Sequence, residues 1–112
     1  MNEANLDVTI GDDYVATVEL REPPNNHISV AMVDALIAAW GDLDADRRCR
    51  AIVLCSAGKH FCAGGDFRPE GGGTAITGAG EGRSVYDEAD KLFANRKPVV
   101  AAVQGSASGG GL

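Results

Sequence analysis

The sequence lacks the features that assign a chain to several common classes of protein. Hydrophobic residues make up 45% of its 112 residues, yet no apolar run approaches the roughly 18–20 residues that a membrane-spanning helix needs. The first five residues are polar and acidic, without the basic and apolar regions of a secretory signal peptide. We therefore expect no membrane partner.

Cysteine is scarce, and its spacing is uninformative. The three cysteines, Cys49, Cys55 and Cys62, are an odd number and form no Cys-x-x-Cys pair. Neither a disulfide framework nor a zinc site is indicated, and we expect no metal. A reducing compartment suits free thiols, so we expect a cytoplasmic location.

Basic residues are outnumbered by acidic ones, 10 to 16, which gives a formal net charge of -6. A surface that follows nucleic acid phosphates is usually basic, so we expect no nucleic acid partner. The balance leaves room for a small anionic ligand, because backbone N–H groups and one or two cations can hold phosphates within an acidic protein.

Three well-known motifs are absent. Gly58 and Lys59 are followed by His60 rather than Ser or Thr, and Val53 stands where a P-loop has its first glycine. In the later glycine-rich segment, Ala107 occupies the position of the serine in a hydrolase nucleophile elbow. The same alanine removes the second glycine of a dinucleotide fingerprint. The residues at these positions therefore exclude a P-loop, a nucleophile elbow and a dinucleotide fingerprint as the reason for the glycines.

The hydrophobic pattern predicts an α/β fold. Alternation around a Gly-Asp-Asp turn favours a hairpin, and apolar residues at helical spacing after Ser29, a suitable N-cap, favour a helix whose Trp40 belongs to the core. Continuous apolar runs favour strands buried on both faces, and alternating strands and helices favour parallel pairing. The expected elements are strands 6–10 and 14–20, helix 30–46, strand 51–55, helix 84–95 with Leu92 and Phe93 facing inward, and strand 99–103.

Two glycine-rich segments carry the strongest functional signal. Residues 59–67 read KHFCAGGDF and residues 97–111 read KPVVAAVQGSASGGG, and each joins an apolar run to small residues and glycine. Glycine lets bare backbone approach a ligand with its N–H groups free. Two such loops can supply the two donors of an oxyanion hole. The alternative is that both segments are only turns.

Individual side chains in these segments are ambiguous. His60 and Cys62 could form a nucleophile pair, but a buried thiol beside a partly exposed loop histidine is the favoured interpretation. His27 could equally contact a ligand or lie in a solvated loop. Asp66 is more suited to accepting loop N–H groups than to acting as a base. Arg68 could pair with a phosphate, although solvation is the default.

The two segments resemble the paired motifs of the crotonase superfamily, also called the enoyl-CoA hydratase/isomerase family. The first family motif is Lys-x-Phe-x-Ala-Gly-Ala-Asp, and the second begins Lys-Pro and ends in a run of three glycines. The resemblance spans about residues 8–112. It implies a spiral of ββα units that is incomplete in this chain. Residues 1–112 would form the N-terminal portion of that domain, without the C-terminal half of the spiral and the trimerisation helices.

The resemblance also implies a ligand and its binding residues. The thioester oxygen of an acyl-CoA would lie between the backbone N–H groups of Gly65 and Gly110, which would be the catalytic groups. Gly65 replaces the commoner alanine, a tolerable change because the donor is backbone. Coenzyme A would enter as part of the substrate, with no separate cofactor. Its path would be lined by Ala63, Gly64, Gly65, Asp66, Phe67, Arg68 and His27.

The implied reaction is the hydration of a 2-enoyl-CoA in fatty acid metabolism, with isomerase, hydrolase and decarboxylase chemistry left open. The first acid/base glutamate of family hydratases would fall at position 113, beyond Leu112. The complete family protein would be a homotrimer or hexamer.

Two alternatives stay open. The chain could be a truncated, inactive acyl-CoA binder or a partner-dependent subunit, or it could be an unrelated α/β domain. If nothing covers the strand at 99–103, its apolar residues would be exposed.

Overall fold

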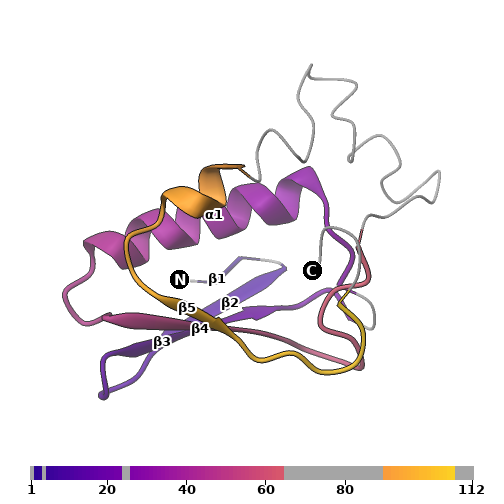
Figure 1. Cartoon of the computed structure of the whole chain (residues 1–112), viewed down its shortest axis with the longest axis horizontal. Helices are drawn as coiled ribbons and strands as arrows, with labels where there is room; N and C mark the ends of the chain where they lie inside the picture. Colours follow the sequence, from indigo (N-terminus) through magenta and orange to yellow (C-terminus); the bar gives the residue numbers. More distant parts are fainter. Residues whose placement is uncertain (1, 4, 24–25, 65–89, 108–112) are drawn as a thin grey trace.

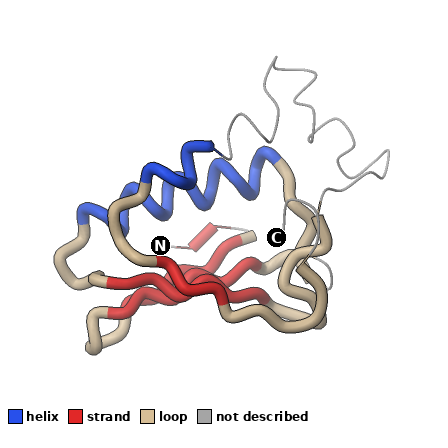
Figure 2. The backbone as a smooth tube through the Cα atoms, in the orientation of Figure 1, coloured by secondary structure: helices blue, strands red, loops and turns tan. Residues whose placement is uncertain are grey.

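The structure is a computed structural model that describes residues 2–3, 5–23, 26–64 and 90–107. The described residues form two layers, a five-stranded sheet with helices packed on one face (Figures 1 and 2). The strands lie side by side in chain order. They are β1 (Asn2–Glu3), β2 (Leu6–Ile10), β3 (Val15–Leu20), β4 (Ala51–Ser56) and β5 (Val99–Ala101), and the helices are α1 (Val30–Ala45) and the 3-10 helix η1 (Asp90–Ala94).

The expected hairpin is present as β2 and β3, which pair antiparallel. Its turn is closed by the Gly11 N–H, which donates to the Val15 carbonyl at 2.9 Å, and by the Asp13 carboxylate, which accepts the Val15 N–H at 3.1 Å. Tyr14 adopts a positive φ of 67° to complete the reversal. The pattern did not predict β1, a two-residue strand antiparallel to β2.

Helix α1 begins where the sequence predicts, because the Ser29 side chain accepts the Met32 N–H at 3.1 Å. Trp40 belongs to the core as expected. Val33, Leu36 and Leu43, which share its helical spacing, are buried as well. Val30 and Ile37 have the same spacing but are only half-buried. The buried residues of α1 are Met32, Val33, Leu36, Ala39, Trp40 and Leu43.

The core lies between α1 and the facing side of the sheet. In β3, alternate residues Ala16, Val18 and Leu20 are buried while the residues between them are not. Period-two alternation is the pattern of a sheet with one covered face. Full burial of a large aliphatic side chain stabilises a fold by about 1.5–3 kcal/mol, so this layer supplies much of the stability.

Parallel pairing of β3 with β4 and of β4 with β5 confirms the α/β prediction. The prediction that both later strands are buried on both faces is wrong for the described residues. Only Ile52 of β4 is buried, and Val99, Val100 and Val103 are 37%, 63% and 54% exposed. In the described part of the chain β5 is one of the two edge strands, and no element covers the sheet face opposite α1. The apolar exposure expected for an uncovered strand is therefore observed.

Of the helix predicted over 84–95, the structure describes residues 90–95. Residues 90–94 form the 3-10 helix η1 beside α1, and residues 84–89 lie outside the described residues. Leu92 packs against the core, but Phe93 is 86% exposed, contrary to prediction. A 3-10 helix has three residues per turn, so neighbouring side chains point in well-separated directions.

Lys97 ties the start of β5 to the end of α1. Its Nζ donates to the carbonyls of Leu43 and, at 2.7 Å, of Asp46. Next to it, the Arg96 N–H donates to the Asp44 carboxylate at 2.9 Å. A cation at the C-terminal end of a helix satisfies free carbonyls and complements the helix dipole.

Candidate functional site

The described parts of the two glycine-rich segments lie side by side. The Phe61 N–H donates to the Gln104 carbonyl at 2.8 Å, and the Cys62 N–H donates to the Ser106 carbonyl at 3.1 Å. Cys62 and Ala107 form an isolated parallel bridge. The pairing of β4 with β5 thus resumes beyond the strand ends, which brings two segments more than 40 residues apart in the sequence into register.

Side chains of Gln104 and Ser56 hold the intervening turn. The Gln104 amide donates to the carbonyls of Ser56 and Gly58 at 2.8 and 3.2 Å. The Ser56 hydroxyl donates to the Phe61 carbonyl at 2.6 Å. Gln104 of the second segment thereby satisfies backbone carbonyls that directly precede the first segment, so the two cannot shift independently without losing these bonds.

Gly105 allows a close approach of the two segments. It has a φ of +58°, and a Cβ added there would lie 2.3 Å from the Lys59 carbonyl oxygen. The following Ser106 N–H donates to Nδ1 of His60 at 3.0 Å. Glycine is required here both for its backbone conformation and for the missing side chain.

Asn26 is a structural anchor of the site that the sequence pattern did not identify. It is fully buried with a φ of +48°. Its Oδ1 accepts the Glu22 N–H at 2.8 Å, and its Nδ2 donates to the carbonyls of Ala57 and His60, both at 2.8 Å. An asparagine after a proline pair is a signal for a turn with a left-handed residue, but it does not reveal the distant carbonyls.

Three of the residues expected along the coenzyme A path are described, and all three lie on two segments that a backbone hydrogen bond joins. The Ile28 N–H donates to the Gly64 carbonyl at 2.7 Å, which joins the segment carrying His27 to the one carrying Ala63 and Gly64. His27 is half-buried, and its Nδ1 has no hydrogen-bond partner in the described part of the chain. The predicted Gly65, Asp66, Phe67, Arg68 and Gly110 lie outside the described residues.

Cys62 and His60 do not form a nucleophile pair in the described geometry. The Cys62 side chain is buried, and burial raises the pKa of its thiol against an opposing hydrogen bond from the Gly64 backbone. Nδ1 of His60 accepts the Ser106 N–H. A buried thiol with a raised pKa is a poor nucleophile, which agrees with the structural interpretation favoured above.

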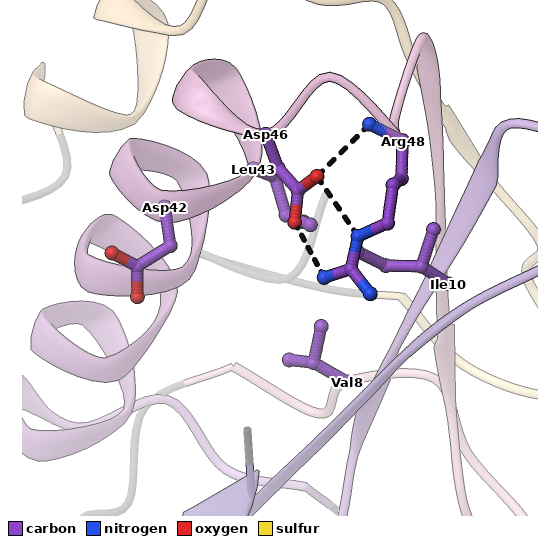
Figure 3. Close-up of a pocket in the computed structure, with 6 residues that line it drawn as sticks. All are labelled: Val8, Ile10, Asp42, Leu43, Asp46 and Arg48. Carbon is purple, nitrogen blue, oxygen red and sulfur yellow. Dashed lines mark hydrogen bonds and ion pairs between the residues drawn. The ribbon is translucent and has the colours of Figure 1, made fainter.

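A separate pocket of about 380 Å³ lies at the other end of the sheet (Figure 3). Ile10, in its lining, pairs with Ala16 at the start of β3, whereas the glycine-rich segments follow the ends of β4 and β5. Arg48 folds back on Asp46 in this pocket, and its side chain holds the pKa of that carboxyl at about 2. We assign the pocket no part in the candidate site. It is lined by Val8, Ile10, Asp42, Leu43, Asp46 and Arg48.

In the described ranges, no three His, Cys, Asp or Glu side chains gather as a metal site would require. None of the helices described there has the length and apolar character to cross a bilayer.

Comparison with known proteins points to the same family that the two glycine-rich segments resemble. Residues 11–112 match the enoyl-CoA hydratase/isomerase family. The chain is 37% identical over 98 residues, 88% of its length, to the peroxisomal bifunctional enzyme of Cavia porcellus. It is 31% identical over its whole length to the "Probable enoyl-CoA hydratase" of Bacillus subtilis (strain 168).

The fold is shared with solved structures as well. The crystal structure of a "probable" enoyl-CoA hydratase from Mycobacterium smegmatis, 34% identical, superposes on 97% of the chain with a TM-score of 0.77. The chain spans 44% of that protein, 43% of the B. subtilis relative and 13% of the C. porcellus enzyme. Its fold is therefore an incomplete crotonase-like α/β fold, and an unrelated α/β domain is excluded. The chain belongs to the enoyl-CoA hydratase/isomerase family.

Proposed function

We propose that the chain holds an acyl-CoA thioester and contributes to hydration of a 2-enoyl-CoA. The thioester oxygen accepts hydrogen bonds from the backbone N–H groups of Gly65 and Gly110. Coenzyme A is part of the substrate, and no separate cofactor or metal takes part. Isomerase, hydrolase and decarboxylase reactions use the same oxyanion chemistry and are the alternatives within the family.

The Cys62–Ala107 bridge is the observation that supports this proposal. Each of the two glycines follows a residue of the bridge by three positions, Gly65 after Cys62 and Gly110 after Ala107. Two parallel segments in register carry corresponding backbone groups to the same end of a sheet. An equal offset from a shared bridge suits two donors that must converge on one oxygen.

Negative charge develops on the thioester oxygen when water adds to the conjugated double bond. A preorganised N–H donor aimed at such an oxygen is typically worth about 3–4 kcal/mol of transition-state stabilisation. Backbone donors suit this task because they carry no charge of their own and need no reorganisation. The replacement of the commoner alanine by Gly65 leaves the donor intact.

The path for coenzyme A runs along the joined segments that carry His27, Ala63 and Gly64. The hydrogen bond from Ile28 to Gly64 brings these segments into contact, and Nδ1 of His27 is buried without a hydrogen-bond partner in the described structure. Asp66, Phe67 and Arg68 continue the same path in the sequence.

The test measures the hydration of crotonyl-CoA by the protein that carries this chain. The reaction is monitored through the loss of the ultraviolet absorbance of the enoyl thioester. Gly110→Pro removes one N–H donor and should lower kcat by about 100- to 1,000-fold. Gly41→Ala, at an open position of α1, is the matched control and should keep full activity. Undiminished turnover in the proline variant would overturn the oxyanion assignment.

A second assay separates the alternatives. Calorimetry with acetoacetyl-CoA measures binding without turnover. Binding by the chain with no hydration would favour the acyl-CoA binder or partner-dependent subunit, while turnover of a different acyl-CoA would identify another family reaction.

We also propose a homotrimer or hexamer for the complete protein, a cytoplasmic location and a role in fatty acid metabolism. The sequence resemblance and the three free cysteines of the described structure support these assignments. Light scattering tests the assembly, and fractionation tests the location, for which the name of the C. porcellus relative offers the peroxisome as a contrasting outcome.

A further inference from the structure

His60 connects the two glycine-rich segments through its side chain. Nδ1 of its half-buried imidazole accepts the Ser106 N–H at 3.0 Å. This is a side-chain contact between the segments in addition to the backbone bonds of Phe61 and Cys62. It lies next to Gly105, where an added Cβ would meet the Lys59 carbonyl oxygen.

The backbone of His60 is fixed from another side. Its carbonyl oxygen accepts a hydrogen bond from the buried Asn26 amide at 2.8 Å. The imidazole is therefore carried on an anchored backbone, and Ser106 is positioned relative to that anchor. Loss of the imidazole contact would leave Ser106 bound to the first segment only through its carbonyl, four residues before Gly110 in the sequence.

The contact depends on the charge of the imidazole. A neutral imidazole has one nitrogen free to accept a hydrogen bond, whereas both nitrogens of a protonated ring are donors. Nδ1 can accept the Ser106 N–H only in the neutral ring with its proton on Nε2. Histidine is the side chain that ordinarily changes charge between pH 5 and 8.

Few other groups in the described structure could alter this behaviour. Residues 104–107 of the second segment carry no titratable side chain. Lys59, next to His60, is exposed. The titratable groups on the segments packed against His60 are Lys59 and Cys62 on its own segment, and Glu22 and His27 on the segment of Asn26.

We propose that neutral His60 is a positioning residue that holds the second glycine-rich segment in place through the Ser106 amide, and that its protonation breaks this contact and weakens acyl-CoA binding. The binding part rests on the proposed function, while the contact itself does not.

The contact is tested by nitrogen–proton NMR of the whole chain between pH 8 and 5. The Ser106 amide resonance should move with the same midpoint as the His60 ring resonances. His60→Asn places an acceptor oxygen at the position of Nδ1 without a titrating group, so its Ser106 amide should stay constant. A Ser106 amide that ignores the titration of His60 in the unsubstituted protein would overturn the proposal.

Binding is tested by calorimetry with acetoacetyl-CoA at pH 7.5 and 5.5. The affinity of the unsubstituted protein should fall roughly fivefold more than that of His60→Asn, the effect of about one hydrogen bond. Titration of the ligand phosphates affects both proteins equally. His60→Leu should bind weakly at both pH values. Circular dichroism checks the folding of His60→Leu. If that variant does not fold, the comparison of the unsubstituted protein with His60→Asn decides the question.

The outcomes distinguish the two proposals. Binding with the same pH dependence in the unsubstituted protein and in His60→Asn would overturn the positioning role and leave the proposed function intact. Absence of acyl-CoA binding in every variant would count against the proposed function, and the NMR titration would still decide whether His60 holds Ser106.

Discussion

The side-chain amide of Asn26 donates a hydrogen bond to the Ala57 carbonyl 2.8 Å away, across 31 positions of sequence. The same nitrogen donates to the His60 carbonyl. One buried amide thus fixes the turn before α1 against the turn after β4. The first glycine-rich segment takes its position from this anchor as well as from the strand that leads into it.

Asn26→Ala should destabilise the fold by about 2–3 kcal/mol, measured by urea denaturation. The Glu22 N–H and two buried carbonyls lose their partner, and an unsatisfied buried group typically costs about 1–3 kcal/mol. Asn26→Gly loses the same bonds but accepts the positive φ, so it should be less destabilised than Asn26→Ala. Equal stability of Asn26→Ala and the unsubstituted protein would contradict the anchoring role.

Gly105→Ala should destabilise the fold and separate the two segments. The new Cβ would meet the Lys59 carbonyl oxygen at 2.3 Å in a backbone conformation with φ of +58°. Such local strain costs on the order of 1–3 kcal/mol. Gly41→Ala, in open space on α1, should instead stabilise by about 0.4–1 kcal/mol. Thermal melts of the two variants should therefore move in opposite directions, and a common direction would contradict the argument.

Much of the fold follows from local pattern. The hairpin turn, the Ser29 cap and the periodicity of α1 each act over a few residues, so the sequence predicts β2, β3 and α1 closely. Burial of β4 and β5 could not be predicted from their apolar runs, because it depends on what covers the far face of the sheet. The contacts of Asn26 and His60 join turns that are distant in sequence, and no local pattern encodes such partners.

The Asp46 carboxyl should titrate near pH 2 in the folded protein. Hydrogen bonds from the Arg48 side chain and backbone lower its pKa from 3.8 to about 2. A depressed carboxyl pKa stabilises the fold above the unfolded value, and the contribution is lost as pH falls toward 2. In Arg48→Ala the midpoint should rise only part of the way to 3.8, since the backbone N–H still donates.

Carbon-detected NMR of the Asp46 carboxyl measures this midpoint. Arg47→Ala is the matched control and should leave it unchanged. A midpoint near 3.8 in the unsubstituted protein would mean that the Arg48 hydrogen bonds do not persist in solution.

The Cys62 thiol should react slowly with iodoacetamide at pH 8 until the chain is unfolded. Burial raises its pKa and limits access. Because the folded state disfavours the thiolate, the unfolded chain ionises first as pH rises through the usual thiol range, and stability declines there. Mass spectrometry of alkylated peptides, with and without urea, measures the difference. Rapid native labelling of Cys62 would revive the nucleophile interpretation.

The register of the parallel strands has a consequence for changes in chain length. From the last β4–β5 pair, Leu54 with Ala101, to the Cys62–Ala107 bridge, one segment advances eight residues and the other six. The turn at 57–60 takes up the difference of two. Inserting or deleting one residue there would displace Cys62 relative to Ala107 by about one strand step, roughly 3.3 Å. An insertion in the 11–14 turn would leave their relative position unchanged, so length tolerance differs sharply between two turns of similar size.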